Sequence, residues 1–310
     1  MNIPVSFQEK IVNCFGETGE EWLQSLEDNV NSIAHDWGLT LESPVTNLSY
    51  NYVIHVIDYN SDPYILKIGL PGFDFQNEVR TLQLYNGQGC AKLLKADASR
   101  GAMLLEKLQP GTMLCAETDE VVVIQNFCHV WKEIRCPLPT AYDFPTVLDW
   151  AAAFPKYQSN HPKNNGPIPN EWVKMAVDYL HEIHQSSTEI GLLHGDLHHE
   201  NILFSNERGW LAIDPKGVAG SPYFDVVSFL INHLFTKSNP EALLKKRVDL
   251  LSESLDLNRE KLLKSAVSMS TLYACWGIED KDSNWDKTYQ CAKWFKGLLE
   301  GNYACHHLDD

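Results

Sequence analysis

The sequence lacks features that mark several protein classes. None of its eight cysteines forms a C-x-x-C pair, and in a chain of this length their scatter favours reduced thiols over a disulfide scaffold. No apolar run approaches the ~20 residues that span a bilayer, so no membrane partner is expected. The first residues do not place an apolar region after a basic one, which argues against a secretory signal. Together these absences predict a cytoplasmic location.

Positive charge is also scarce. The 310 residues include 25 lysines and arginines against 41 aspartates and glutamates, which gives a formal net charge of −16. A field of this sign repels nucleic acid and attracts cations, so DNA and RNA are not expected partners. The charge would suit a cationic small molecule, but acidic soluble proteins are common and the charge alone does not identify a substrate. Nothing in the composition indicates an oligomeric state.

Hydrophobic patterning divides the chain into two parts. Residues 1–107 predict a small N-terminal lobe, with helices at 20–37 and 74–85 and an antiparallel sheet of strands at 50–58, 64–69, 91–95 and 102–105. Residues 108–310 predict a larger, mainly helical lobe that carries a catalytic loop and a metal-binding hairpin. Its expected helices lie at 117–135, 147–153, 170–187, 224–236, 240–254, 258–277 and 284–300.

The most informative stretch is HGDLHHEN at residues 194–201. It places the amide of Asn201 after the carboxylate of Asp196, and two short apolar runs around a polar turn then lead to Asp214. These runs predict a hairpin that returns Asp214 to the side of Asn201. Phosphoryl transfer from a nucleotide needs such a set, because one carboxylate orients the attacking hydroxyl while oxygen donors hold magnesium. We predict that Asp196 is catalytic and that Asn201 and Asp214 are Mg²⁺ ligands.

Three segments carry a family resemblance: HGDLHHEN, then AIDPKG and SPYFDVVSF. Together they resemble the aminoglycoside phosphotransferases, nearest to the branch of streptomycin kinases and hydroxyurea antibiotic-resistance kinases. The likeness spans roughly residues 20–300. It implies an α+β, two-lobed protein-kinase-like fold, with a small antiparallel-sheet N-lobe, a larger mainly helical C-lobe, and ATP with Mg²⁺ in the cleft between them.

A lysine in a predicted strand is the first candidate for nucleotide binding. Lys67 sits between apolar neighbours, where an inward-facing charge is costly unless it is paired. Glu78 on the next helix is the natural partner, although both side chains could instead face solvent. The resemblance implies that this pair anchors the α- and β-phosphates of ATP.

The resemblance also implies a hinge that binds adenine through backbone groups of Glu106, Lys107 and Leu108. The leucine could equally be a core residue, and the two roles are compatible. The loop expected to cover the phosphates, residues 46–51, contains no glycine, whereas kinases place glycines there so that backbone amides can approach phosphate. Ser49 can support a tight turn and donate a hydrogen bond, and we include it among the cofactor-binding candidates.

The remaining candidates have supporting roles. We expect His194 to tie the catalytic loop to the core, and the resemblance implies that Asp225 braces this loop through backbone amides; a plain helix N-cap is the alternative. The nearby histidines lack the H-E-x-x-H spacing of a zinc helix. An acidic, aromatic patch near the last helices could bind amino or guanidino groups, although a solvated helix end explains it as well. Its residues are Trp276, Glu279, Asp280 and Asp282.

These observations predict an ATP-dependent phosphotransferase that moves the γ-phosphoryl group to a hydroxyl of a small polar molecule. The first candidate acceptor is an aminoglycoside of the streptomycin type, which would make the protein an antibiotic-resistance kinase. The alternatives are the same chemistry on an amino alcohol, a sugar or hydroxyurea, or a catalytically silent relative that still binds nucleotide. The glycine-free loop favours a silent relative. The presence of all the polar residues that the reaction needs argues against it, and these are Lys67, Glu78, Asp196, Asn201 and Asp214.

Overall fold

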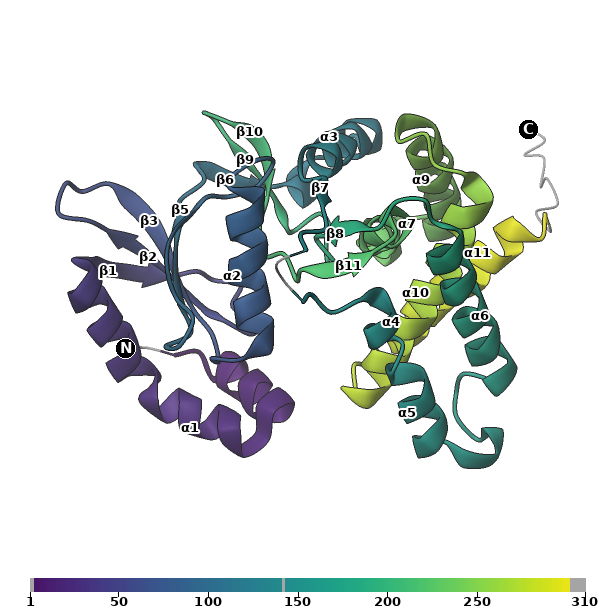
Figure 1. Ribbon diagram of the computed structural model, residues 1–310, viewed down its shortest axis with the longest axis horizontal. Helices are drawn as coiled ribbons and strands as arrows, with labels where there is room; N and C mark the ends of the chain where they lie inside the picture. The colour runs from purple at the N-terminus through teal and green to yellow at the C-terminus, as the bar shows by residue number, and fades with distance from the viewer. Residues whose placement is uncertain (1–2, 141–142, 302–310) are drawn as a thin grey trace. The chain divides into compact units, whose positions relative to one another are not determined.

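The computed structural model describes residues 3–140 and 143–301 of the chain. These residues form two compact units (Figure 1). The first unit contains the described chain up to Thr112 together with Leu203–Lys216, and the second contains Met113–Ile202 and the described chain from Gly217 onward. No helix within the described residues is long and apolar enough to cross a membrane.

A five-stranded antiparallel sheet forms the centre of the first unit, in the order β1-β2-β3-β5-β4. The strands predicted within residues 50–69 and 91–105 are confirmed. The edge strand β1 was not predicted, because its sequence Thr-Leu-Glu-Ser-Pro has no apolar alternation and is largely exposed. The bounds are β1 (Thr40–Pro44), β2 (Tyr52–Ile57), β3 (Pro63–Ile68), β4 (Leu93–Asp97) and β5 (Ala102–Glu106).

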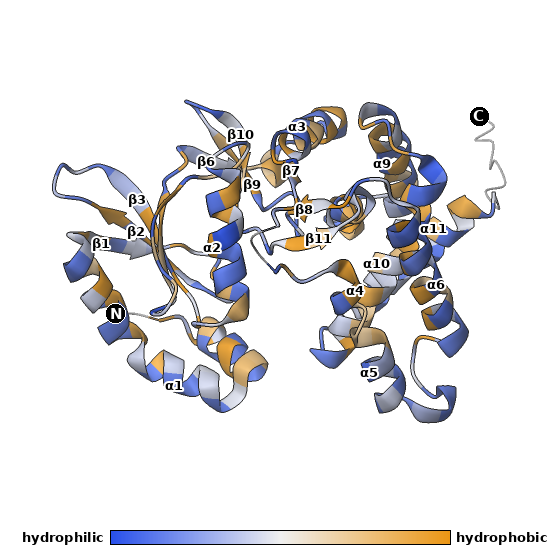
Figure 2. Ribbon diagram, in the orientation of Figure 1, coloured by the Kyte–Doolittle hydropathy of each residue, from blue (hydrophilic) through white to orange (hydrophobic). Residues whose placement is uncertain are grey.

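Two helices complete the core of this unit. The first, α1 (Val5–Trp37), is longer than predicted and is kinked at Gly16, whose φ of 56° suits a residue without a Cβ. Its second arm buries the apolar face that the sequence predicts, and its first arm adds Phe7 and Ile11 to the same core as Tyr52. Blue and orange residues are interspersed along α1 in Figure 2, as expected for a helix with one buried face. The other helix, α2 (Phe73–Tyr85), matches its prediction.

A hairpin from the middle of the chain belongs to the first unit, whereas the sequence places it with the second. Its strands β9 (Ile202–Ser205) and β10 (Gly209–Ala212) join β6 (Pro110–Met113) in a three-stranded sheet. The Ala212 amide donates to the carbonyl of Gly89 over 2.8 Å. Hydrogen bonds of this kind hold the hairpin to the first unit, and they are made by residues too distant in sequence for local patterning to reveal.

Helices make up most of the second unit, and α10 lies at its centre, packed against α6 and α11. A small antiparallel sheet of order β11-β8-β7 holds the start of the catalytic loop. The helices are α3 (Glu120–Glu133), α4 (Val147–Trp150), α5 (Ala153–Asn160), α6 (Asn170–Ser186), α7 (Pro222–Asp225), α8 (Val227–Ile231), α9 (Pro240–Ser254), α10 (Arg259–Glu279) and α11 (Trp285–Leu299). The strands are β7 (Cys136–Pro137), β8 (Gly191–Leu193) and β11 (Val218–Gly220), and the short 3₁₀ turns are η1 (Leu114–Ala116), η2 (Pro162–Asn164) and η3 (Leu234–Thr236).

The single helix predicted over residues 224–236 is wrong. The chain instead forms α7 and α8, which are divided at Val226, and then η3, before which His233 takes a left-handed conformation with φ of 58°. The other helices predicted after residue 108 are present within a few residues of their expected bounds, and the short one near 147–153 is divided between α4 and α5. The α+β organisation, with a sheet-based first unit and a mainly helical second unit, is the one that the sequence predicts.

Candidate active site

The loop after β8 in the second unit holds Asp196 through its backbone. The Asp196 amide donates to Nδ1 of His194 over 3.2 Å, and the side-chain amide of Asn201 donates to the Asp196 carbonyl over 2.9 Å. Since the nitrogen of the Asn201 amide is used in this contact, its oxygen Oδ1 is the end that a cation would use. A hard oxygen of this kind suits Mg²⁺.

Asp225 braces the same loop from α7. Its carboxylate accepts the amide of Gly195 over 2.7 Å and that of His194 over 3.4 Å, and only 5% of the residue is exposed. The N-cap of α7 is Ser221, so Asp225 does not cap the start of that helix. Burial raises the pKa of Asp225 to about 6, although the two amides and Arg135 pull the pKa down.

The raised pKa of Asp225 predicts a pH-dependent difference in stability from an Asp225→Asn variant. Folded protein holds this proton up to about pH 6, whereas the unfolded chain releases it near 3.8. Stability from this group is therefore present at low pH and falls as pH rises through that window. Relative to the variant, the wild type should lose about 3 kcal/mol of unfolding free energy between roughly pH 4 and pH 6.

Urea unfolding of both proteins across this pH range checks the prediction. Other carboxylates titrate alike in the two proteins, so the difference between their curves isolates Asp225. Parallel curves would show that Asp225 keeps an ordinary pKa in the folded protein.

The first unit contains a buried charge cluster. Nζ of Lys67 lies 2.5 Å from Oε1 of Glu78 and 3.0 Å from Oδ1 of Asp214, and Lys67 is only 2% exposed. Burial lowers the pKa of this lysine, but the charges and hydrogen bonds of the two carboxylates outweigh burial and raise it, so the side chain stays charged. The structure thus brings together three residues that the sequence assigns to nucleotide and metal binding.

Asp214 also has an unusual backbone. Its φ is 58°, in the left-handed region that residues other than glycine seldom adopt. Such conformations are concentrated at functional sites, where surrounding structure holds them in place. Here the preceding strand β10 is paired within the first unit, and Lys67 holds the Asp214 carboxylate.

The predicted adenine hinge follows β5. Leu108 is buried with Ala91 and Leu211 in a small apolar cluster, which could contact a purine. The Glu106 carboxylate accepts the backbone amide of Lys92 over 2.8 Å and pairs with Arg208. This carboxylate therefore fastens the hinge to the β9–β10 hairpin, while Lys107 is partly exposed.

Arg208 is a residue that sequence reasoning missed. Besides Glu106, it donates to the backbone carbonyls of Gly87 and Cys90. It occupies the turn of the hairpin that leads to Asp214, so it links the position of that hairpin to the hinge. The only sequence signal is a lone basic residue in a polar turn, and such residues usually face solvent.

Ser49 lies in the exposed loop between β1 and β2. The ammonium of Lys10 donates to its hydroxyl over 3.4 Å and lies 5.0 Å from the ring centroid of Tyr50. The first arm of α1 therefore contacts this loop, and the structure shows no contact of Ser49 with the cluster around Lys67 among the hydrogen bonds of the described residues.

Comparison with known proteins identifies the family. The sequence pattern of the aminoglycoside/hydroxyurea antibiotic resistance kinases matches residues 37–281. The chain belongs to this family. A streptomycin 6-kinase from Streptomyces glaucescens is 25% identical in an alignment of 288 residues that covers 90% of this kinase and 92% of that protein. A hydroxyurea phosphotransferase from Kitasatospora aureofaciens is 26% identical over 90% of this kinase and 81% of its own length.

Solved structures agree on the fold. Choline kinase LicA from Streptococcus pneumoniae matches with a TM-score of 0.60 and 17% identity, over 88% of this kinase and 99% of that chain. Aminoglycoside phosphotransferase APH(4)-Ia, in a ternary complex with ADP and hygromycin B, matches with a TM-score of 0.59 and 12% identity, over 88% and 98%. The predicted protein-kinase-like fold is confirmed. Since the family and its named members transfer phosphate to hydroxyl groups, this kinase is a phosphotransferase with an alcohol-type acceptor.

The predicted acceptor patch of the kinase lies at the C-terminal end of α10. Trp276 meets Trp150 edge to face, with ring centroids 5.6 Å apart. Glu279 pairs with Lys156, and burial together with the charge of Glu279 raises the pKa of Asp280. The patch therefore combines two edge-on aromatic rings with carboxylates, of which Glu279 is paired with Lys156.

Tyr273 is a second residue that the sequence did not single out. It packs against Trp276, with ring centroids 5.7 Å apart, and its hydroxyl lies 3.2 Å from Oγ of Ser228. Burial raises its pKa, and the charges of Asp196 and Asp225 raise it further. Tyr273 therefore contacts Trp276 of the acceptor patch and lies close enough to Asp196 and Asp225 to be affected by their charges.

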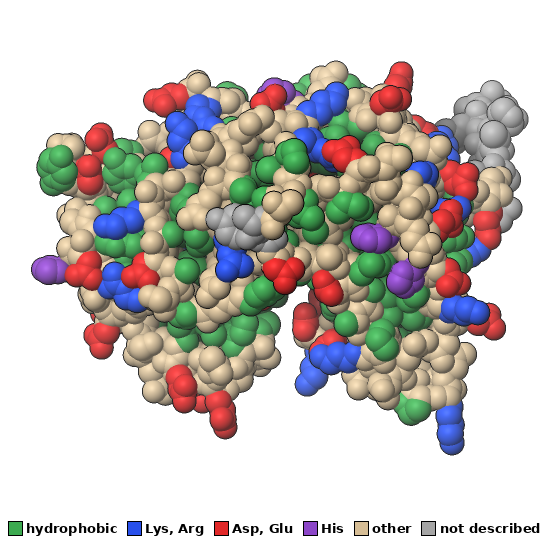
Figure 3. Space-filling model, in the orientation of Figure 1, with side chains coloured by type: hydrophobic (Ala, Val, Ile, Leu, Met, Phe, Trp, Pro, Cys, Tyr) green, Lys and Arg blue, Asp and Glu red, His purple; other side chains and the backbone are tan. Residues whose placement is uncertain are grey.

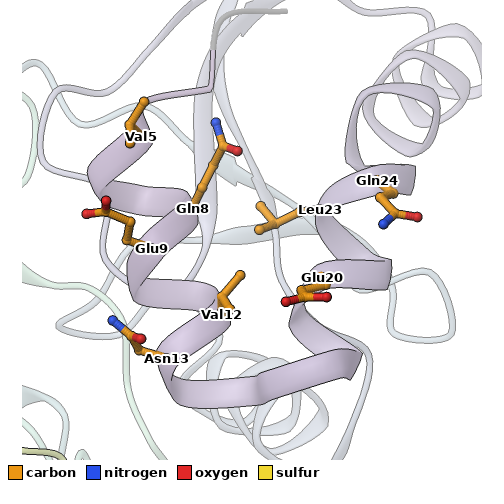
Figure 4. A pocket seen from close by; sticks show the side chains of 8 residues that line it. All are labelled: Val5, Gln8, Glu9, Val12, Asn13, Glu20, Leu23 and Gln24. Carbon is orange, nitrogen blue, oxygen red and sulfur yellow. The ribbon is translucent and has the colours of Figure 1, made fainter.

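Two surface pockets do not coincide with these residues. One, of about 620 Å³, is formed by both arms of α1, with Gln8, Val12 and Leu23 among its side chains (Figure 4). The other, of about 410 Å³, includes Trp285 and Tyr289 of the second unit. None of the predicted site residues lines either pocket. Acidic and basic side chains are interspersed on the face shown in Figure 3, so charge of one sign does not dominate there.

Proposed function

We propose that the protein transfers the γ-phosphoryl group of ATP to a hydroxyl of an aminoglycoside of the streptomycin type. The observation that carries this proposal is the construction of the catalytic loop. Asp196 is held through its backbone on both sides and braced by Asp225, as a reaction that depends on positioning requires. The streptomycin 6-kinases among its relatives, which align over 90% of the chain, support this choice of acceptor.

We assign a magnesium-dependent mechanism to three residues, which are Asp196 and Asn201 of the catalytic loop and Asp214 after β10. Asp196 would accept a hydrogen bond from the acceptor hydroxyl, align its oxygen for attack and take up the proton late in the transfer. Oδ1 of Asn201 and the carboxylate of Asp214 would hold Mg²⁺, since both present hard oxygen donors. When bound, the ion would neutralise charge on the phosphates.

Nucleotide binding is assigned to the first unit. Lys67, kept charged by Glu78 and Asp214, would bind the α- and β-phosphates as a fixed point charge. Backbone groups of residues 106–108 would bind the adenine edge, and Leu108 would contact the ring. Ser49 would contact the phosphates from its exposed loop. Since ATP is the donor, we also propose a cytoplasmic location.

Acceptor binding is assigned to the second unit. Trp276 offers a flat face to a sugar ring or a guanidinium, and Glu279 and Asp280 would attract its positive charge. Tyr273, close to Trp276 and in the field of Asp196, would limit how the acceptor enters. A cationic, multi-ring acceptor would use all of these features.

Hydroxyurea is the second candidate acceptor. The hydroxyurea phosphotransferase relative favours it, at 26% identity over 90% of the chain. Hydroxyurea is small and uncharged, so it would make no use of the carboxylates beside Trp276. Assaying ATP consumption with streptomycin, other aminoglycosides, choline, simple sugars and hydroxyurea separates these candidates. The proposal expects the highest kcat/KM with streptomycin, and selective turnover of hydroxyurea would replace it.

Thermal unfolding tests whether the protein binds MgATP at the proposed site. At about 100 times its Kd, MgATP should stabilise the wild type by about 2.7 kcal/mol, which raises Tm by a few degrees. Asp214→Ala should remove most of this shift, because the variant loses both a metal ligand and a partner of Lys67. Asp256 also has a left-handed backbone, with φ of 51°, and is exposed, so Asp256→Ala is the matched control and should keep the shift. Equal shifts in all three proteins would exclude Asp214 from the metal site.

A further inference from the structure

The carboxylate of Asp196 has a histidine neighbour in its own loop. Nε2 of His198 lies 3.7 Å from Oδ1 of Asp196, and the two side chains are 15% and 36% exposed. The hydrogen bonds described above hold the backbone of Asp196. The imidazole lies beside the carboxylate itself, where it can influence the rotation of that group.

A second contact decides which nitrogen of this ring carries the proton. The backbone amide of Glu200 donates to Nδ1 of His198 over 3.2 Å. A ring nitrogen that accepts a hydrogen bond bears no proton, so the neutral imidazole carries its proton on Nε2. The loop therefore turns an N–H donor toward Asp196, and the local backbone fixes this tautomer.

The neighbouring histidine has a different environment. The ring of His199 stacks on Phe229, with centroids 4.4 Å apart, and its Nε2 lies 3.1 Å from the guanidinium of the buried Arg247. His199 thus anchors the loop in the core, while His198 borders the catalytic carboxylate. The two adjacent side chains divide anchoring and positioning between them.

We propose that His198 is a positioning residue for Asp196. Its Nε2–H, held in place by the Glu200 amide, attracts Oδ1 and so sets the plane in which the carboxylate meets the acceptor hydroxyl. This inference rests on the proposed function. It predicts a loss in the rate of transfer rather than in nucleotide binding, because His198 acts through the carboxylate that receives the acceptor hydroxyl.

Two substitutions separate positioning from loop support. Glutamine places an N–H donor near the location of imidazole Nε2 and can reach Asp196. Asparagine is shorter; it can accept the Glu200 amide as Nδ1 does, but it cannot reach Asp196. If His198 positions Asp196, His198→Asn should lower kcat about 10- to 100-fold with an unchanged KM for ATP. His198→Gln should stay within about threefold of the wild type.

The opposite ranking, with asparagine active and glutamine impaired, would show that His198 only supports the loop and would overturn the inference. His35 offers a matched control, since its ring lies 3.6 Å from the Asp36 carboxylate on the surface of the first unit; His35→Asn should leave kcat unchanged. Tm values establish that each variant is folded. If His198→Asn does not fold, His198→Ala replaces it in the comparison. The kcat of His198→Gln must then exceed that of His198→Ala.

The same assay separates this inference from the proposed function. A wild type that transfers phosphate, together with an equally active His198→Asn, would overturn the role of His198 alone. A wild type that transfers phosphate to no acceptor in the panel would overturn the proposed function and, with it, this inference.

Discussion

Replacement of Asp196 by asparagine is expected to lower kcat for phosphate transfer by about 10²- to 10⁴-fold. Asparagine keeps the size of the side chain and leaves the backbone contacts to His194 and Asn201 intact. It removes the carboxylate that aligns the hydroxyl and takes up its proton. Because this group acts on the acceptor, KM for ATP should stay within about threefold of the wild type.

Coupled detection of ADP with the best acceptor of the panel measures both constants. Asp62 is exposed and lies outside the site, so Asp62→Asn serves as the control and should match the wild type. A folded Asp196→Asn protein with full kcat would remove Asp196 from the mechanism. A rise in KM for ATP with kcat unchanged would instead make it a nucleotide-binding residue.

The largest effect on stability is expected at Lys67. Methionine has a similar length and no charge, so Lys67→Met leaves the buried Glu78 carboxylate without its counter-ion. Breaking a buried pair in this way costs about 3–5 kcal/mol of unfolding free energy. Adding Glu78→Gln removes the orphaned charge, and the double variant should regain most of that loss.

Urea denaturation of the two single variants and the double variant measures this coupling. Lys245 pairs with Asp249 on the surface, and its side chain is 50% exposed, so Lys245→Met should cost less than about 1 kcal/mol. Additive losses at Lys67 and Glu78 would show that the two charges do not depend on each other. Lys67→Met should also lose the stabilisation by MgATP, since Lys67 is assigned to the phosphates.

Sequence patterns predict those elements that form because of their own residues and immediate neighbours. Strands β2 and β3 and the β9–β10 hairpin are apolar runs separated by turn residues, and they appear where expected. Strand β6 could not be predicted in this way, because Pro-Gly-Thr-Met has no strand pattern and becomes a strand only by pairing with β9. The first arm of α1 could have been found from the spacing of Phe7 and Ile11, which both reach the core.

The site residues differ in the same way, since local sequence indicates some of them and only the folded structure reveals the others. The spacing of Asp196 and Asn201 is local, so residue chemistry alone indicated that pair. One strand and the next helix supply Lys67 and Glu78, but both side chains could have faced solvent, and only the family resemblance favoured their pairing. Arg208 pairs with Glu106, which is 102 residues away in the sequence. No local sequence pattern predicts a contact over such a separation. Likewise, Tyr273 becomes a site candidate only when folding brings α10 near the catalytic loop.

We propose that this kinase transfers phosphate from ATP to a hydroxyl with Asp196 as the catalytic carboxylate. The most direct measurement is the mass of streptomycin after incubation with ATP, Mg²⁺ and either the wild type or Asp196→Asn. The wild type is expected to add one phosphate group to the antibiotic, and the variant is expected to add almost none in the same time. Unmodified streptomycin with the wild type, or equal modification by both proteins, would contradict it.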